Sequence, residues 1–300
     1  MRAALPPVAV AISTRDRADL LERCLQSLAD GTLTPAEIVV ADQSDGPETQ
    51  ELVTRLPATP ESVRYIRARP GGLGVAQNDA FRATTAPVVA VLDDDCVADE
   101  RWLESIARAF ASEEVAFVSG PVLPLGPDAP GLHAVASRTS LQRRELDAHV
   151  MPWDAGSGNN FAVRRHWFER IGGCDERLGP GAPGRGGLDM DLFRRLLRAG
   201  ARGLYNPDVL VLHERATTAG RLARRFPYGY GMGACCVLWI RQRDTQGFRV
   251  LARWIAMRSN RLARSLVRRR WQAVHEELLV LAGTARGVLF GLRAREHRPG

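Results

Sequence analysis

Three consecutive carboxylates follow a short apolar run. Asp93, Asp94 and Asp95 come directly after Val88–Leu92. Carboxylate oxygens are hard ligands that suit Mg²⁺ or Mn²⁺, and such an ion also binds phosphate oxygens. Because side chains alternate along an extended chain, we expect Asp93 and Asp95 on one side and Asp94 on the other. The alternative is a solvated acidic turn in which Asp95 caps a helix. The position after a buried strand favours the metal site.

The segments that must position these carboxylates alternate between strand and helix patterns. Such alternation predicts a mainly parallel sheet built from βαβ units. Strands are expected at Val8–Ile12, Ile38–Ala41, Val63–Arg67, Val88–Leu92 and Val115–Val118, and helices at Ala18–Leu28, Glu48–Leu56, Leu73–Thr84 and Trp102–Phe110.

Polar segments follow three of these strands. The three polar segments are Ser13–Arg17, Asp42–Gly46 and Asp93–Asp95. Open α/β sheets bind ligands in the crevice outside the carboxyl ends of their parallel strands. We therefore expect the three segments to share one edge of the sheet and to line one crevice.

The second part of the chain is less regular. Residues 121–155 are rich in proline, and a short helix is expected around Leu132–Leu146. Phe161–Val163 and Val209–Leu212 have the pattern of further strands. Leu188–Ala199 has apolar residues at a spacing of four and is followed by a glycine, which predicts a helix that ends there.

The composition limits the class of protein. The chain has 300 residues, of which 45% are hydrophobic and 25% charged, and this balance is typical of a globular protein with a sizeable core. No apolar run reaches the roughly 20 residues that a membrane-spanning helix needs. The five cysteines show no metal-ligand spacing and suggest reduced thiols. We expect a cytoplasmic protein, with possible peripheral contact at the inner face of the membrane.

The positive charge gathers in the last 80 residues. Residues 221–300 contain 17 arginines and four acidic residues, although the whole chain has a net charge of only +7. Around 247–271 an imperfect apolar stripe alternates with arginine, a pattern typical of helices at an anionic lipid surface. Helices that merely pack on the rest of the protein would show the same pattern. Nucleic acid binding is a third interpretation, which we consider unlikely.

The sequence resembles the inverting family 2 glycosyltransferases over roughly residues 8–215. Each matching segment is weakly specific alone, but seven occur in the family's order. They are VAVAISTRDR, IVVADQSDG, RPGGLGVAQNDAF, VLDDDCV, GSGNNFAVRRHWFERIGGCDERLG, GGLDMDLFRRLLRAG and NPDVLVLHE. The resemblance implies a GT-A fold over residues 1–220, with a nucleotide-binding half (1–120), an acceptor-binding half (121–220) and a helical extension (221–300).

The same resemblance implies a role for individual residues. Asp95 would bind the divalent cation, Mn²⁺ or Mg²⁺, with His213 completing its coordination. Asp189 would be the catalytic base that deprotonates the acceptor hydroxyl. Apart from the resemblance, Asp191 two residues later is interpreted as a helix-start or supporting carboxylate, with the role of base as the less favoured alternative. The nucleoside-diphosphate sugar would be held by Thr14, Arg15, Asp42, Gly72, Asn78, Asp93 and Asp94, with Asp42 reading the base.

Three residues near the family's acceptor segment are candidate sugar contacts. Trp153 could stack on a sugar or simply pack, and Asn159 and Asn160 could hydrogen-bond sugars or simply form a turn. The sequence does not distinguish a glycan, a lipid-linked acceptor or a small molecule. Nor does it name the donor sugar.

Two departures from the family pattern keep other functions open. Leu188 stands where the family has a glutamate before the base, and Gln77 stands where it has an arginine. A catalytically degenerate relative that still binds nucleotide sugars is therefore an alternative. A nucleotidyltransferase is less favoured, because the glycine-rich and basic loop expected after its first strand is absent.

Overall fold

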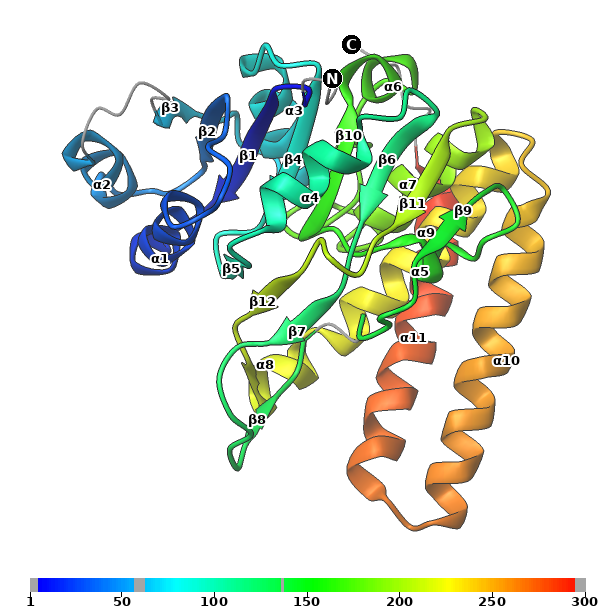
Figure 1. Cartoon of the computed structure of the whole chain (residues 1–300). Helices are drawn as coiled ribbons and strands as arrows, with labels where there is room; N and C mark the ends of the chain where they lie inside the picture. The colour runs from blue at the N-terminus through cyan, green and yellow to red at the C-terminus, as the bar shows by residue number, and fades with distance from the viewer. Residues whose placement is uncertain (1–4, 57–62, 136–137, 295–300) are drawn as a thin grey trace.

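A computed structural model describes residues 5–56, 63–135 and 138–294. Its centre is an eight-stranded sheet in which β10 and β9 run antiparallel to their neighbours and the other strands run parallel (Figure 1). In spatial order the strands are β3 (Val63–Arg67), β2 (Glu37–Asp42), β1 (Val8–Thr14), β4 (Val88–Leu92), β10 (Asn160–Arg164), β6 (Val115–Ser119), β11 (Arg202–Tyr205) and β9 (Arg144–Leu146).

Helices cover both faces of this sheet because its strands are apolar on both sides. In β1, Val8, Val10 and Ile12 belong to one hydrophobic cluster, whereas Ala9 and Ala11 belong to another. The first cluster includes residues of α1 (Ala18–Ala29), α2 (Glu48–Arg55) and α4 (Trp102–Ala109). The second includes residues of α3 (Leu73–Ala83), α6 (Arg165–Arg170) and α7 (Leu188–Arg198).

A small second sheet lies beside the end of β4. It has the order β5 (Cys96–Ala98), β12 (Val211–His213), β7 (Val122–Pro124), and in its register His213 lies opposite Cys96. This pairing places His213 next to the Asp93–Asp95 segment, although the two are more than 100 residues apart in the sequence. A two-stranded sheet of β8 (Leu132–His133) and β13 (Ala216–Thr217) continues beyond it.

The C-terminal region consists of α8 (Thr218–Ala223), α9 (Arg225–Arg241), α10 (Gln246–Val267) and α11 (Trp271–Arg293). Helices α10 and α11 form a long hairpin that projects away from the sheet (Figure 1). Helix α11 packs on α9 with the backbones almost touching: a Cβ added at Gly287 would lie 1.9 Å from the carbonyl oxygen of Tyr230. Buried residues of α9, α10 and α11 share one hydrophobic cluster with α7.

Within the described residues, the structure contains no helix with both the length and the apolar character needed to cross a bilayer. Helix α10 has the length, but arginines recur along it.

The structure confirms the alternating strands and helices of the first 120 residues, and β3 and β4 have the predicted bounds. The helix predicted around Leu132–Leu146 is wrong. Its two ends form the short strands β8 and β9, with irregular chain between them apart from residues 136 and 137, which lie outside the described residues. The pairing partners of these strands, β13 and β11, come from distant sequence.

Candidate active site

The aspartate run forms a tight turn at the carboxyl end of β4. The backbone N–H of Cys96 donates to the carbonyl of Asp93 (3.1 Å), which closes the turn. The expected alternation of side chains along an extended chain is therefore wrong. Instead, the Arg17 Nη1 group lies 3.2 Å from an oxygen of Asp94 and 3.3 Å from an oxygen of Asp95. Two carboxylates predicted on opposite sides thus share one guanidinium.

The loop after β1 holds this turn from one side. Thr14 is buried, and its hydroxyl donates to Asp94 Oδ2 (2.8 Å). The loops after β1 and β2 are also joined, because the N–H of Asp16 donates to the Ser44 hydroxyl (2.7 Å) and the N–H of Asp45 donates to Asp16 Oδ1 (3.0 Å). These bonds confirm that the three post-strand segments lie together at one edge of the sheet.

His213 faces the turn from the small sheet. Its Nε2 lies 3.3 Å from Asp95 Oδ1, and both residues are buried. The other ring nitrogen, Nδ1, lies 2.6 Å from the carbonyl oxygen of Glu214. A carbonyl only accepts, so Nδ1 carries a proton, and Nε2 is the ring nitrogen that faces Asp95. Asp95 Oδ1 has no hydrogen-bond donor among the described residues.

The site concentrates negative charge. Burial raises the pKa of Asp93 well above its usual value, and the charges of Asp95 and Asp94 raise it further, whereas Arg17 lowers it. The charge of Asp189 makes a smaller contribution to the same rise. One guanidinium against several carboxylates leaves a surplus of negative charge that suits a divalent cation.

Asp42 lies at the end of β2 with no exposed surface. One of its oxygens accepts from the backbone and the hydroxyl of Ser44, and the other accepts from the Tyr65 hydroxyl (3.0 Å) and lies 3.5 Å from Arg67 Nη1. The structure therefore does not leave Asp42 open to a nucleobase. It makes Asp42 the support for Tyr65 and Arg67. Arg15, by contrast, is exposed and lies close to Asp16 of its own loop (3.4 Å) and to Asp45 of the loop after β2 (3.8 Å).

The glycine-rich loop before α3 packs tightly on the segment before α7. Gly72 has φ +98°, and a Cβ there would lie 2.6 Å from the carbonyl oxygen of Pro180. Asn78 is buried and binds the backbone of Cys174 in both directions, with its amide donating to the carbonyl (3.0 Å) and its carbonyl accepting from the N–H (2.8 Å). The structure corrects the expected donor contact of Asn78: its polar atoms fix the loop instead.

Asp189 is half-buried in the first turn of α7. Its oxygens accept from the N–H of Gly158 (3.2 Å) and of Met190 (2.9 Å). Burial raises the pKa of Asp189, and these two backbone hydrogen bonds partly oppose the rise. A raised pKa makes the carboxylate a better proton acceptor. Gly158 is needed for this contact, because a Cβ there would lie 3.0 Å from the Cβ of Asp189.

Asp191, two residues later, is a structural group. It is 2% exposed, and its oxygens accept from Trp239 Nε1 in α9 (2.8 Å) and from Arg195 Nε in α7 (2.7 Å). Both oxygens are thus engaged inside the protein. Of the two carboxylates at the start of α7, Asp189 is the more exposed, whereas Asp191 ties α7 to α9.

The three expected acceptor contacts have different surroundings. Asn160 is fully buried, accepts from Trp102 Nε1 (2.9 Å) and donates to the carbonyls of Pro121 (2.9 Å) and Val209 (2.7 Å). The structure corrects its assignment, since no polar atom remains for a sugar. Asn159 keeps a buried Oδ1 without a partner among the described residues. Trp153, in α5 (Pro152–Ala155), packs its ring 5.9 Å from that of Trp254 in α10.

Several residues of the site were not predicted from the sequence. Arg17 bridges two aspartates, Tyr65 holds Asp42, and Gly158 holds Asp189. Cys96 places its sulfur within 4.8 Å of the facing atoms of Asp95 and His213. Arg17 lies in the STRDR segment, where Arg15 is the other basic residue. A search for positive charge near the three aspartates could therefore have selected it from the sequence. The others depend on contacts between distant segments.

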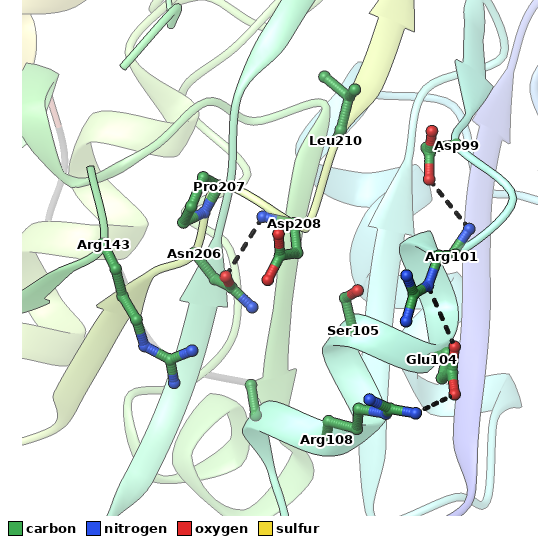
Figure 2. A pocket seen from close by; sticks show the side chains of 11 residues that line it. Asp99, Arg101, Glu104, Ser105, Arg108, Arg143, Asn206, Pro207, Asp208 and Leu210 are labelled. Atoms are coloured by element: carbon green, nitrogen blue, oxygen red, sulfur yellow. Dashed lines mark hydrogen bonds and ion pairs between the residues drawn. The ribbon is translucent and has the colours of Figure 1, made fainter. Parts of the chain in front are cut away.

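The structure also has a cavity of about 490 Å³ away from the aspartate turn, between α4 and the loop after β11 (Figure 2). Its acidic and basic side chains largely pair with one another: Arg101 contacts Glu104 (3.7 Å), and Arg108 also binds Glu104. None of the candidate site residues lines this cavity.

The sequence segments and the geometry agree with a family comparison. The family model for glycosyl transferase family 2 matches residues 9–172, more than half of the chain. The chain belongs to this family. The pre-mycofactocin glycosyltransferase of Mycobacterium tuberculosis is 30% identical over 242 residues, which cover 79% of this chain and 48% of the relative. This chain thus spans about half the length of that family 2 relative.

A second relative matches over nearly its whole length. The N-acetylglucosaminyl-diphospho-decaprenol L-rhamnosyltransferase of Mycobacterium tuberculosis is 27% identical over 312 residues, covering 88% of this chain and 94% of the relative.

Solved structures confirm the GT-A fold. The mannosyltransferase PcManGT of Pyrobaculum calidifontis, in complex with GDP-Man and Mn²⁺, superposes with a TM-score of 0.65 at 18% identity and covers 95% of this chain and 88% of its own. Residues 1–349 of S. aureus TarS, in complex with UDP-GlcNAc, superpose with a TM-score of 0.59 at 16% identity, covering 78% and 66%.

Proposed function

We propose that this family 2 glycosyltransferase moves a sugar from a nucleoside-diphosphate sugar to an acceptor hydroxyl with inversion, using a divalent cation and Asp189 as the base. The observation that carries the proposal is the Asp95–His213 pair. A buried carboxylate oxygen and a ring nitrogen face each other at 3.3 Å with no donor between them. Two lone pairs in that arrangement need either a second proton on the ring or a metal cation.

The donor set fits Mn²⁺ or Mg²⁺. Asp95 supplies an oxygen and His213 a neutral nitrogen whose orientation is fixed by the Glu214 carbonyl. When bound, the cation would supply charge stabilisation for the leaving diphosphate. Arg17 would hold Asp94 and Asp95 in place beside it and bring a second positive charge to the same turn.

The remaining donor contacts follow from the loops after β1 and β2. We assign the binding surface for the nucleobase of the donor to Tyr65 and Arg67. Asp42 holds both side chains in place. Thr14 positions Asp94 rather than meeting the donor directly. Arg15 is exposed in the loop after β1, and its guanidinium would leave its surface ion pairs with Asp16 and Asp45 to bind the diphosphate.

Asp189 is the proposed base. Its raised pKa and its place in the first turn of α7, where the backbone N–H groups of Gly158 and Met190 fix the carboxylate, suit a group that takes the proton of an attacking hydroxyl. One displacement at the anomeric carbon inverts its configuration. The unpartnered Oδ1 of Asn159, next to Gly158 that binds Asp189, would hydrogen-bond the acceptor or the donor sugar.

The two departures from the family pattern are accommodated by packing. Leu188 is buried against Gly74 and Gly179, and Gln77 is buried and accepts from the Cys174 thiol (3.3 Å). Neither residue places an unpaired charge in the site. This favours an active enzyme over a degenerate relative.

We further propose a lipid-linked acceptor and peripheral contact between the helical region and an anionic membrane. The name of the rhamnosyltransferase relative describes a diphospho-decaprenol acceptor, and the arginines of the last 80 residues suit lipid phosphates. The alternative acceptors, a soluble glycan or a small molecule, remain outcomes of the test.

The test is incubation of the full chain with a panel of nucleotide sugars, Mn²⁺ and membrane extract. Release of nucleoside diphosphate that depends on the extract supports sugar transfer to an acceptor in it. Release of pyrophosphate would instead indicate a nucleotidyltransferase. Donor binding in thermal-shift measurements without any release would indicate the degenerate relative.

A further inference from the structure

The turn between α10 and α11 exposes a cluster of apolar side chains. We use "hairpin turn" for residues Leu266–Trp271, which lie at the end of the hairpin farthest from the sheet (Figure 1). Val267 is 84% exposed, Trp271 67% and Leu266 46%. Three large apolar side chains at one projecting tip are unusual for a surface that meets only water.

The charges around this cluster all have one sign. Five exposed arginines lie in or next to the turn, and none of them forms an ion pair with another described residue: Arg261, Arg264, Arg268, Arg269 and Arg270. No aspartate or glutamate occurs between Asp244 and Glu276. The turn therefore presents uncompensated positive charge together with apolar surface.

The backbone of the turn keeps an arginine where glycine is the usual residue. The N–H of Arg270 donates to the Ser265 carbonyl (2.9 Å) and the N–H of Arg269 to the Leu266 carbonyl (3.0 Å), the hydrogen-bond pattern of a Schellman motif. Arg269 occupies its left-handed position with φ +52°. A side chain there carries a conformational cost that glycine avoids. Arg269 lies exposed in the short connection between α10 and α11.

We propose that the hairpin turn docks on an anionic phospholipid bilayer. Val267, Trp271 and Leu266 would enter the boundary between headgroups and acyl chains, while the arginines contact lipid phosphates. The inference deepens the proposed membrane contact and rests on it, by naming the surface that makes it. A nucleic acid would use the arginines but would leave the apolar side chains without a role, so the bilayer is favoured.

The turn is far from the catalytic groups. Trp254, the residue of α10 that packs on Trp153 beside the site, precedes Val267 by 13 residues. At 1.5 Å per helical residue the turn lies about 20 Å farther along the helix. Substitutions in the turn should therefore leave the release of nucleoside diphosphate from a soluble donor unchanged.

The chain contains a matched control for Arg269. Arg243, after the end of α9, is also exposed, has φ +62° and is followed by a residue whose N–H donates back to the preceding helix, Asp244 to the Trp239 carbonyl (2.9 Å). Arg269→Gly and Arg243→Gly each remove one charge and one strained side chain. Phe248→Asp, at a 61% exposed residue near the start of α10, is the matched control for Trp271→Asp.

The test is flotation of the full chain and its variants with vesicles of phosphatidylcholine, with and without phosphatidylglycerol. We expect binding only to the anionic vesicles, weakened by salt. Arg269→Gly should bind about fivefold more weakly, the equivalent of about 1 kcal/mol per basic residue, and Trp271→Asp should lose binding. Arg243→Gly and Phe248→Asp should bind as the wild type does.

Each other outcome overturns a defined part of the proposal. If the full chain binds but both arginine variants and both aspartate variants bind equally, another part of the helical region makes the contact. Absence of binding to anionic vesicles removes the membrane contact and the hairpin turn together, and leaves the catalytic proposal untouched. Tight binding of duplex DNA that Trp271→Asp does not change would indicate a nucleic acid surface, and self-association abolished by Trp271→Asp would indicate a second copy.

Discussion

The crevice at the end of β4 and the hairpin turn both concentrate charge, but they treat it in opposite ways. In the crevice, Arg17 binds Asp94 and Asp95, Thr14 binds Asp94, and backbone N–H groups bind Asp189. In the hairpin turn the arginines are exposed and form no ion pairs within the described residues. Fixed charges can hold a reacting geometry, whereas free charges can adapt to a fluid surface.

The two regions should therefore respond differently to substitution. A change in the crevice alters a geometry that several groups share, so its effect should be large and specific to one step. Substitution of one arginine in the hairpin turn removes one of several equivalent charges, so its effect should be small and additive. Variants of the crevice should also leave vesicle binding unchanged.

The largest expected effect belongs to the base. Asp189→Asn keeps the size of the side chain but removes its capacity to accept a proton, and transfer should fall by about 10²- to 10⁴-fold. Initial rates of nucleoside diphosphate release with a saturating donor and acceptor would measure this. Because burial raises the pKa of Asp189, its charged form costs folding free energy at neutral pH, so the variant should unfold at the same or a higher temperature.

Removal of the metal ligand should have the next largest effect. Asp95→Ala takes away the oxygen that faces His213, and both donor affinity and turnover should fall, the turnover by about 10²-fold or more. Chelation of divalent cations with EDTA should reproduce the loss in the wild-type protein, and added Mn²⁺ should restore it. Full transfer activity in excess EDTA would contradict the metal site.

Asp191 should matter for stability. Asp191→Ala leaves Arg195 and Trp239 without their buried partner, and the free energy of unfolding should fall by about 3 kcal/mol. Denaturant titration measures this loss. Below the unfolding transition the variant should keep most of its transfer rate. A rate loss as large as that of Asp189→Asn, in a protein that is still folded, would exchange the roles of the two carboxylates.

The smallest expected effect is a displacement of the pH profile. The base must be deprotonated to act, so kcat/KM should fall as the pH drops through the pKa of Asp189. Since burial raises that pKa, the acidic limb should have its midpoint above the value of about 3.9 for a free aspartate. An acidic limb at or below that value would be inconsistent with Asp189 as the base.

The strands of the first half were predictable because each carries a local signal. Val88–Leu92 is a continuous apolar run that ends abruptly at three aspartates, and β4 has those bounds. The joining of the three post-strand loops follows from the parallel arrangement. The same reasoning failed at the aspartates themselves, because it treated Asp93–Asp95 as extended chain whereas a turn begins there.

Partners that lie far apart in sequence were not predictable. Asn160 lies in a segment typical of the family's sugar site, but its side-chain amide accepts a hydrogen bond from Trp102 and donates one to the Val209 carbonyl. Asn78 is engaged in the same way by Cys174. Conversely, the role of Gly158 arises only because the start of α7 lies beside it. A single sequence indicates which residue types lie at an edge of the sheet. It does not indicate which of them form hydrogen bonds with distant residues and which can bind a ligand.

The central claim is a division of work between the aspartate turn, which holds the donor, and Asp189, which accepts the proton. The most direct test is the dissociation constant of the donor, measured by titration calorimetry with Mn²⁺, for Asp189→Asn and Asp95→Ala beside the wild type. The account predicts a value within about twofold of the wild type for Asp189→Asn and a strongly weakened one for Asp95→Ala. Equal loss of donor binding in both variants would contradict the division.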